Sequence, residues 1–140
     1  MPLVCVDASV VVAWLLPDYR TPAVSRRMSA YLEGDDEFVA PHLLMAEVVS
    51  TLRRRVVQGF LTPDQGRLLV GNFLRLGIAL QSPPGLYARS YDLATTFNQP
   101  RAYDACYLAL ADLLSCELLT LDQRLYNAVA SEFPRIRVVG

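Results

Sequence analysis

The sequence predicts an α/β domain in which a central parallel sheet of about four or five strands is sandwiched by helices. Short apolar segments alternate along the chain with longer segments whose apolar residues recur at helical spacing. No low-complexity stretch, internal repeat or linker interrupts this alternation. Strands that alternate with helices favour parallel pairing. We therefore expect one domain over residues 1–140, with the doubly wound architecture.

The short apolar segments are expected to form the strands of this sheet. They lack the strict alternation of a half-exposed strand, and continuous apolar runs are typical of strands covered on both faces. The expected strands are Leu3 to Val6, Phe38 to Ala40, Ile78 to Gln81, Leu118 to Leu121 and Ile136 to Val139.

The longer segments are expected to form helices, and several of their ends carry capping signals. Thr21 and Pro22 supply a cap and a first-turn proline, and Gly59 ends another helical segment. The stretch TPDQ at positions 62–65 matches a capping box. The expected helices are Ser9 to Leu16, Pro22 to Leu32, Pro41 to Gln58, Pro63 towards Gly77, Leu86 to Phe97, Ala102 to Ser115 and Arg124 to Ser131.

The composition indicates a folded protein without a membrane span. Hydrophobic residues make up 53% and charged residues 19% of the chain, unlike the composition of disordered proteins. The longest apolar run, Val10 to Leu16, is far shorter than the roughly 18 residues of a membrane-spanning helix, and nothing resembles a signal peptide. We expect a cytoplasmic protein. The three cysteines, Cys5, Cys106 and Cys116, lack CxxC spacing, so we expect buried reduced thiols.

The charges exclude several classes of site. A net charge of −1 provides no bulk attraction to nucleic acid, so a polyanionic partner would be held by local charge or by metal. All 13 basic residues are arginines, which excludes sites that require a lysine, such as the Walker loop. No GxGxxG motif follows the first expected strand, which disfavours dinucleotide binding.

Four acids interrupt apolar segments and are the candidate functional residues. Asp7 and Asp122 each follow an expected strand, and open α/β sheets bind ligands at the carboxyl ends of their strands. An alternative is that each aspartate caps the helix that follows it. Asp104 lies in the first turn of a helix that is apolar around nearly its whole circumference, where it could have a functional role or satisfy the helix dipole.

Glu47 is the fourth acid, and periodicity assigns it to a solvated helix face. The apolar stripe of its helix is formed by other residues, and Glu47 points away from it. Asp112 lies eight residues after Asp104, roughly 12 Å along the helix axis. It is therefore expected to be an exposed or partnered acid outside the site.

Four stretches of the sequence resemble, in order, the motifs of PIN-domain ribonucleases. These stretches are VDASV, AEVVSTLRRR, AYDACYLALAD and LLTLDQRL, and together they span nearly the whole chain. The resemblance is greatest to the small VapC-type toxins of toxin–antitoxin pairs. It implies metal-dependent endonucleolytic hydrolysis of RNA, a VapB-like antitoxin as a partner, and a homodimer. The alternative is a PIN-like module that binds RNA or protein without cleaving.

The resemblance also implies roles for individual residues. The acidic set that would bind metal and act in catalysis is Asp7, Glu47, Asp104 and Asp122. Ser9 and Thr120 match hydroxyl positions that would orient a ligand or water. Ser50 stands where many relatives carry asparagine. Carboxylates without histidine or thiolate favour hard cations, so we expect Mg²⁺, with Mn²⁺ as an alternative.

Other polar and aromatic residues are assigned more limited roles. The basic run Arg53, Arg54 and Arg55 could hold RNA phosphates, or it could place cations near the C-terminal end of its own helix. His42 is expected to have a structural or solvent-facing role, and Trp14 is expected to lie in the core or in a subunit interface.

Overall fold

The computed structural model describes residues 2–16 and 22–139, and these form a parallel sheet covered by helices on both faces. Within this part of the chain the sheet has five strands in the order β3-β2-β1-β4-β5, and every neighbouring pair is parallel. The predicted fold class is therefore confirmed. The strands are β1 (Leu3–Val6), β2 (Glu37–Ala40), β3 (Ala79–Leu80), β4 (Glu117–Thr120) and β5 (Ile136–Val138).

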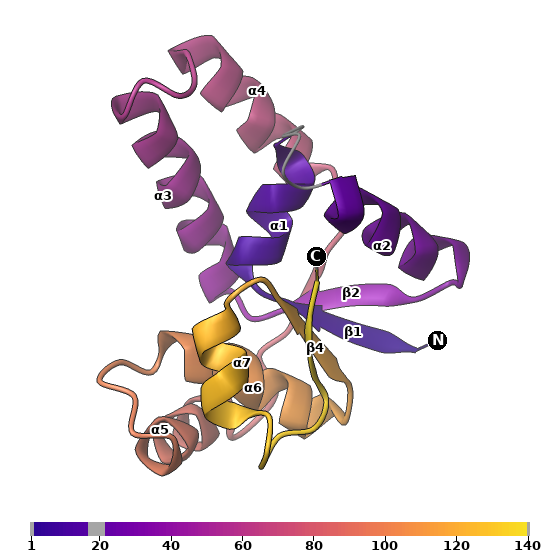
Figure 1. Ribbon diagram of the computed structural model, residues 1–140, viewed down its shortest axis with the longest axis vertical. Coiled ribbons are helices and arrows are strands. Elements are labelled where there is room, and N and C mark those ends of the chain that lie inside the picture. Colours follow the sequence, from indigo (N-terminus) through magenta and orange to yellow (C-terminus); the bar gives the residue numbers. More distant parts are fainter. Residues whose placement is uncertain (1, 17–21, 140) are drawn as a thin grey trace.

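The helices that precede β3 cover one face of the sheet, and the helices that follow β3 cover the other face. Figure 1 shows α1 to α4 above the strands and α5 to α7 below them. This division follows from right-handed crossovers, since the chain runs from β1 to one edge and then returns to build the other half. The helices are α1 (Ala8–Leu15), α2 (Pro22–Glu33), α3 (Leu43–Val57), α4 (Pro63–Leu74), α5 (Leu86–Thr96), α6 (Tyr103–Leu114) and α7 (Gln123–Val129).

Several predicted helix ends differ from those in the structure by a few residues. The helix expected from Pro41 begins at Leu43, because the chain first makes a turn in which the Leu44 amide donates to the Pro41 carbonyl (3.0 Å). Gly59 follows this helix with a φ of 83°, as expected of a terminating glycine. The predicted cap at Thr21 lies outside the described residues.

The predicted capping box at the start of α4 is present. The Thr62 hydroxyl accepts a hydrogen bond from the Gln65 amide (3.1 Å), and the Gln65 side chain accepts one from the Thr62 amide (2.9 Å). Both bonds satisfy amides that have no partner within the helix.

We expect Thr62→Ala to lower the free energy of unfolding by about 1 kcal/mol, because it removes one of these bonds. Chemical denaturation measures this change. Thr96→Ala at the C-terminal end of α5 is the control, since the Thr96 hydroxyl bonds only the Asp92 carbonyl. An equal loss in both variants would contradict the capping role.

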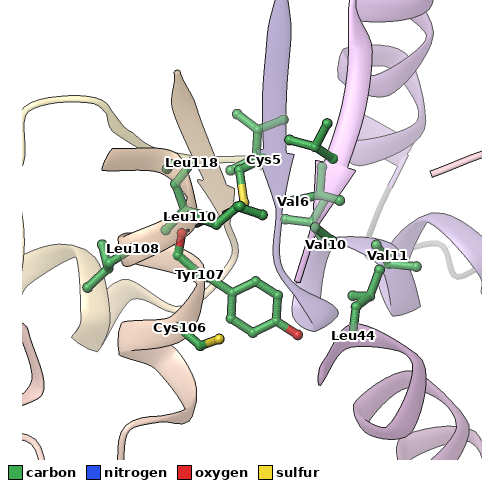
Figure 2. Packing of buried hydrophobic residues seen from close by; sticks show 14 of the residues in the cluster. Cys5, Val6, Val10, Val11, Leu44, Cys106, Tyr107, Leu108, Leu110 and Leu118 are labelled. Atoms are coloured by element: carbon green, nitrogen blue, oxygen red, sulfur yellow. Dashed lines mark hydrogen bonds between the residues drawn. The ribbon is translucent and has the colours of Figure 1, made fainter. Parts of the chain in front are cut away.

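Helix α6 is the most buried helix of the described chain, as its apolar sequence predicted. All residues from Ala105 to Ala111 are buried against the sheet and α5. Figure 2 shows Leu110 of α6 beside Cys5 of β1, and the Tyr107 ring extending towards Val10 of α1. The three cysteines are free and buried, as predicted. In the residues that the structure describes, no helix is long and apolar enough to cross a membrane.

Candidate functional site

Asp7 lies at the carboxyl end of the central strand β1 and is buried, with 7% of its surface exposed. Its Oδ1 accepts hydrogen bonds from the Ser9 hydroxyl (2.6 Å) and from the Val10 amide (3.1 Å). Its Oδ2 accepts a hydrogen bond from the Thr120 hydroxyl (2.5 Å). The carboxylate is therefore held in one orientation by donors from α1 and from the end of β4.

The two hydroxyls predicted to lie beside the acids also join the ends of the two strands. Thr120 accepts a hydrogen bond from the Asp122 amide (2.9 Å) while it donates to Asp7. Ser9 accepts one from the Leu121 amide (3.0 Å) while it also donates to Asp7. The chain segments that carry Asp7 and Asp122 are thus connected through two side-chain hydroxyls.

Both aspartates at strand ends are helix caps, so the capping alternative raised by the sequence is confirmed. Asp7 caps α1 through its bond with the Val10 amide. Asp122 caps α7, because its Oδ1 accepts hydrogen bonds from the amides of Arg124 (3.0 Å) and Leu125 (3.2 Å). A cap at the carboxyl end of a strand holds its side chain at the edge where such sheets bind ligands, so the two roles are compatible.

Glu47 does not lie on a solvated face, and that prediction is wrong. Its side chain is half-buried at the second turn of α3, and Oε1 accepts a hydrogen bond from the Tyr107 hydroxyl (2.5 Å). Periodicity located the face of α3 that points away from its own apolar stripe. It gave no information about α6, which supplies the tyrosine.

Tyr107 is the residue of this site that sequence reasoning missed. It was counted among the apolar residues of α6, and indeed only 2% of its surface is exposed. Figure 2 shows its ring extending from α6 towards the region of α1 and α3. A buried tyrosine hydroxyl usually has a hydrogen-bond partner. A tyrosine within an otherwise apolar helix was therefore a signal that a polar group lies opposite.

Burial makes ionisation of Asp7 and Glu47 unfavourable. Burial raises the pKa of Asp7 to about 6, although the hydrogen bonds from Ser9, Thr120 and Val10 partly oppose it, and the Asp104 charge adds to it. Burial also raises the pKa of Glu47, where the bond from Tyr107 acts in the opposite direction and the Asp104 charge again raises it.

Asp104 interacts electrostatically with each of the other three acids. Burial raises its pKa, the negative charge of Asp122 raises it further, and the positive charge of Arg124 lowers it. Since Asp104 in turn raises the pKa values of Asp7 and Glu47, its carboxylate interacts with all three other acids. The N-caps of α1 and α7, the first turn of α6 and the second turn of α3 thus bring the four acids together in one acidic cluster at the carboxyl edge of the sheet.

The donors of this cluster fit a divalent cation in chemistry, but they do not form a closed coordination shell. All four are carboxylates, the ligands that hard cations prefer. Within residues 2–16 and 22–139, however, no group of three or more His, Cys, Asp and Glu side chains is placed so that it could hold a metal ion. Oxygens of Asp7, Glu47 and Asp122 are engaged in hydrogen bonds with the protein. Such a cluster suits an ion that keeps part of its water shell.

The structure distinguishes among the arginines near these acids. Arg53 and Arg54 are exposed on α3, and Arg55 is half-buried there. Arg124 is the arginine whose charge acts on the cluster, and its Nε lies 4.0 Å from Asp122 Oδ1. The Arg124 side chain is 96% exposed, so this contact contributes little stability.

The remaining residues singled out in the sequence lie outside the cluster. Asp112 forms an ion pair with Arg89 (3.0 Å), which confirms it as a partnered acid. His42 is exposed in the turn before α3. Trp14 is half-buried and packs edge-on against Phe38, with ring centroids 5.5 Å apart, so it belongs to the periphery of the core. Ser50 is exposed on α3.

Comparisons with known proteins agree with the fold. The PIN domain family model matches residues 4–130. Ribonuclease VapC9 of Mycobacterium tuberculosis is 32% identical over 132 residues, which cover 94% of this chain and 95% of that protein. The chain therefore belongs to the PIN-domain family, and this relative places it among the VapC ribonucleases. The resemblance inferred from the four sequence motifs is confirmed.

Solved structures of low sequence identity share the whole fold. PAE2754 from Pyrobaculum aerophilum has a TM-score of 0.72 at 16% identity and covers 99% of this chain and 90% of its own. VapBC2 from Rickettsia felis, bound to a DNA fragment from the VapBC2 promoter, has a TM-score of 0.71 at 10% identity and covers 99% of both chains. These structures share the fold of this chain, which the family model identifies as the PIN domain.

Proposed function

We propose that this protein is a metal-dependent endoribonuclease and the toxin of a VapBC-type toxin–antitoxin pair. The observation that carries this proposal is the buried Asp7, held by Ser9 and Thr120 at the strand end and coupled through Asp104 to Glu47 and Asp122. Membership among the VapC ribonucleases supports the choice of RNA as the substrate.

The acids would share the work of binding the cation and orienting water. Asp7, Asp104 and Asp122 would hold a divalent ion directly or through water, and Glu47 would serve as a ligand or as a proton acceptor. When bound, such an ion lowers the pKa of a water molecule and stabilises the charge that develops on the leaving oxygen of a phosphodiester. Ser9 and Thr120 would keep both oxygens of Asp7 in place, and Mg²⁺ is the expected ion, with Mn²⁺ as a substitute.

A cation would also remove the electrostatic conflict within the cluster. Burial and mutual repulsion raise the pKa values of Asp7, Glu47 and Asp104, so the metal-free cluster resists full ionisation. A divalent ion reverses this effect because it favours the charged carboxylates. We therefore expect metal affinity to fall steeply as the pH drops below about 6, where Asp7 takes up a proton.

RNA and protein partners belong to the same proposal. The arginines of α3, Arg53 to Arg55, offer forked donors for phosphate, and Arg124 lies closer to the acids. A small VapB-like antitoxin and a homodimer are expected from the family. Co-expression with the protein encoded by a small adjacent reading frame, followed by size-exclusion chromatography, tests both.

The nuclease proposal is tested with purified protein, RNA and controlled divalent ions. We expect cleavage with Mg²⁺ or Mn²⁺, none with excess EDTA, and recovery when the ion is restored. Asp104→Asn should show no cleavage above background. Asp112→Asn should retain full activity, because Asp112 lies on the same helix but pairs with Arg89.

Two outcomes would overturn the nuclease proposal. Cleavage that is equal in Asp104→Asn and in the wild type would identify a contaminating nuclease. RNA binding without any cleavage under all ions would instead favour a non-catalytic module of the same fold.

A further inference from the structure

We propose that Tyr107 is a positioning residue for Glu47, fixing one carboxylate oxygen so that the other is available to the bound ion or water. This inference rests on the proposed nuclease function and assigns a role to a residue outside the four acids. It concerns the hydroxyl group alone, since the ring of Tyr107 already has a role in the core.

The contact is short and links two separate helices. The Tyr107 hydroxyl of α6 donates to Glu47 Oε1 of α3 at 2.5 Å, across 60 residues of sequence. A hydrogen bond from a hydroxyl to a carboxylate at this distance is among the strong ones in proteins. Among the described residues, Tyr107 is the only hydrogen-bond partner of the Glu47 side chain. The Thr51 hydroxyl bonds the Glu47 backbone carbonyl instead.

The donor itself is held rigidly. Tyr107 is 2% exposed, and Figure 2 shows its ring beside Cys106 of α6 and directed towards Val10 of α1 and Leu44 of α3. Its backbone carbonyl also faces the Cys5 thiol of β1 (3.8 Å). A side chain packed in this way has few alternative rotamers, so it can impose its position on the more exposed Glu47.

Tyr107 also relates Glu47 to a second acid of the cluster. It lies three residues after Asp104 on α6, and side chains at this spacing share one face of a helix. One face of α6 therefore carries Asp104 and, through the Tyr107 hydroxyl, also binds Glu47 of α3. With Oε1 oriented by Tyr107, Glu47 presents Oε2, which has no such partner, to the bound ion or water.

Tyr107→Phe tests this role, because it removes the hydroxyl and keeps the ring. We expect the affinity for Mn²⁺, measured by calorimetry on the protein alone, to fall about 10- to 100-fold. The Mn²⁺ concentration for half-maximal RNA cleavage should rise by a similar factor. Thermal unfolding in EDTA checks that the variant remains folded.

Tyr31→Phe is a matched control. The Tyr31 hydroxyl also donates to a glutamate, Glu117 Oε1 (3.4 Å), but Glu117 begins β4 whereas the acidic cluster lies at the other end of that strand. This variant should bind Mn²⁺ and cleave RNA like the wild type.

A double-mutant cycle separates positioning from a general loss of structure. Glu47→Ala should weaken Mn²⁺ binding, and adding Tyr107→Phe to it should weaken binding no further, since Tyr107 acts through Glu47. Independent losses that add in the double variant would overturn the inference, as would unchanged Mn²⁺ affinity in folded Tyr107→Phe.

The wild type distinguishes this inference from the proposed function. A wild-type protein that binds Mn²⁺ and cleaves RNA, with an unaffected Tyr107→Phe variant, would overturn the positioning role alone. A wild-type protein that does neither would overturn both proposals.

Discussion

Asp7→Asn is expected to stabilise the metal-free protein at pH 8 and to abolish RNA cleavage. Loss of one carboxylate from the cluster removes several kcal/mol of transition-state stabilisation by a bound ion, which corresponds to about a 10²- to 10³-fold lower rate. The opposite effect on stability follows from the burial of this side chain. A residue whose replacement stabilises the fold while abolishing activity is typical of a functional site.

The sign of the stability change follows from the raised pKa of Asp7. Burial raises this pKa from 3.8 to about 6, so folding favours the protonated form. The free energy of unfolding of the metal-free protein should therefore fall as the pH rises from about 4 through about 6, and it should stay lower above that range. A shift of about 2 pH units corresponds to about 3 kcal/mol, an upper value for the gain in Asp7→Asn.

Denaturant unfolding in EDTA at pH 4 and at pH 8 measures this gain. Asp7→Asn should exceed the wild type at pH 8 and should lose this advantage at pH 4, where the wild-type carboxyl is protonated. Added Mn²⁺ should then stabilise the wild type and not the variant, because a ligand that binds only the folded state raises its stability. Asp112→Asn is the control for removing an acid outside the cluster, and a variant that matches the wild type at pH 8 would contradict the argument.

The acids differed in how well the sequence could place them. Asp7 and Asp122 were located by a rule about strand ends, which requires only the alternation of strands and helices. Asp104 was located by its apolar surroundings, because a helix that is apolar all round must be buried. Each of these inferences depends on a segment of fewer than about 15 residues around the acid.

Glu47 and Tyr107 could not be placed in the same way, because their contact depends on the packing of two helices far apart in sequence. Periodicity describes one helix at a time and cannot show which helix packs against its polar face. The order of the strands in the sheet could not be predicted from the sequence either, because it depends on the direction in which each crossover connection runs. A partner for the Tyr107 hydroxyl was implied by its apolar helix, but the identity of that partner came from the fold.

Thr120→Val is expected to lower the free energy of unfolding by about 3 kcal/mol and RNA cleavage by about 10- to 100-fold. Valine keeps the shape of threonine but removes a hydroxyl that is 0% exposed and makes two bonds. One bond is donated to Asp7 Oδ2 (2.5 Å), and the other is accepted from the Asp122 amide (2.9 Å). The change therefore leaves a buried carboxylate oxygen and a backbone amide without these partners, and the strand ends lose one of their two connections.

The loss in Thr120→Val should depend on pH in a way that identifies its cause. The hydrogen bond from Thr120 lowers the pKa of Asp7, so its removal raises that pKa above the wild-type value of about 6. The variant should therefore be more strongly destabilised at pH 8, where Asp7 is ionised in the wild type, than at pH 4. Thr120→Ser keeps the hydroxyl and should recover most of the activity and the wild-type pH dependence. A destabilisation that is equal at both pH values would mean that Thr120 acts through packing, and that Asp7 is oriented by Ser9 and the Val10 amide.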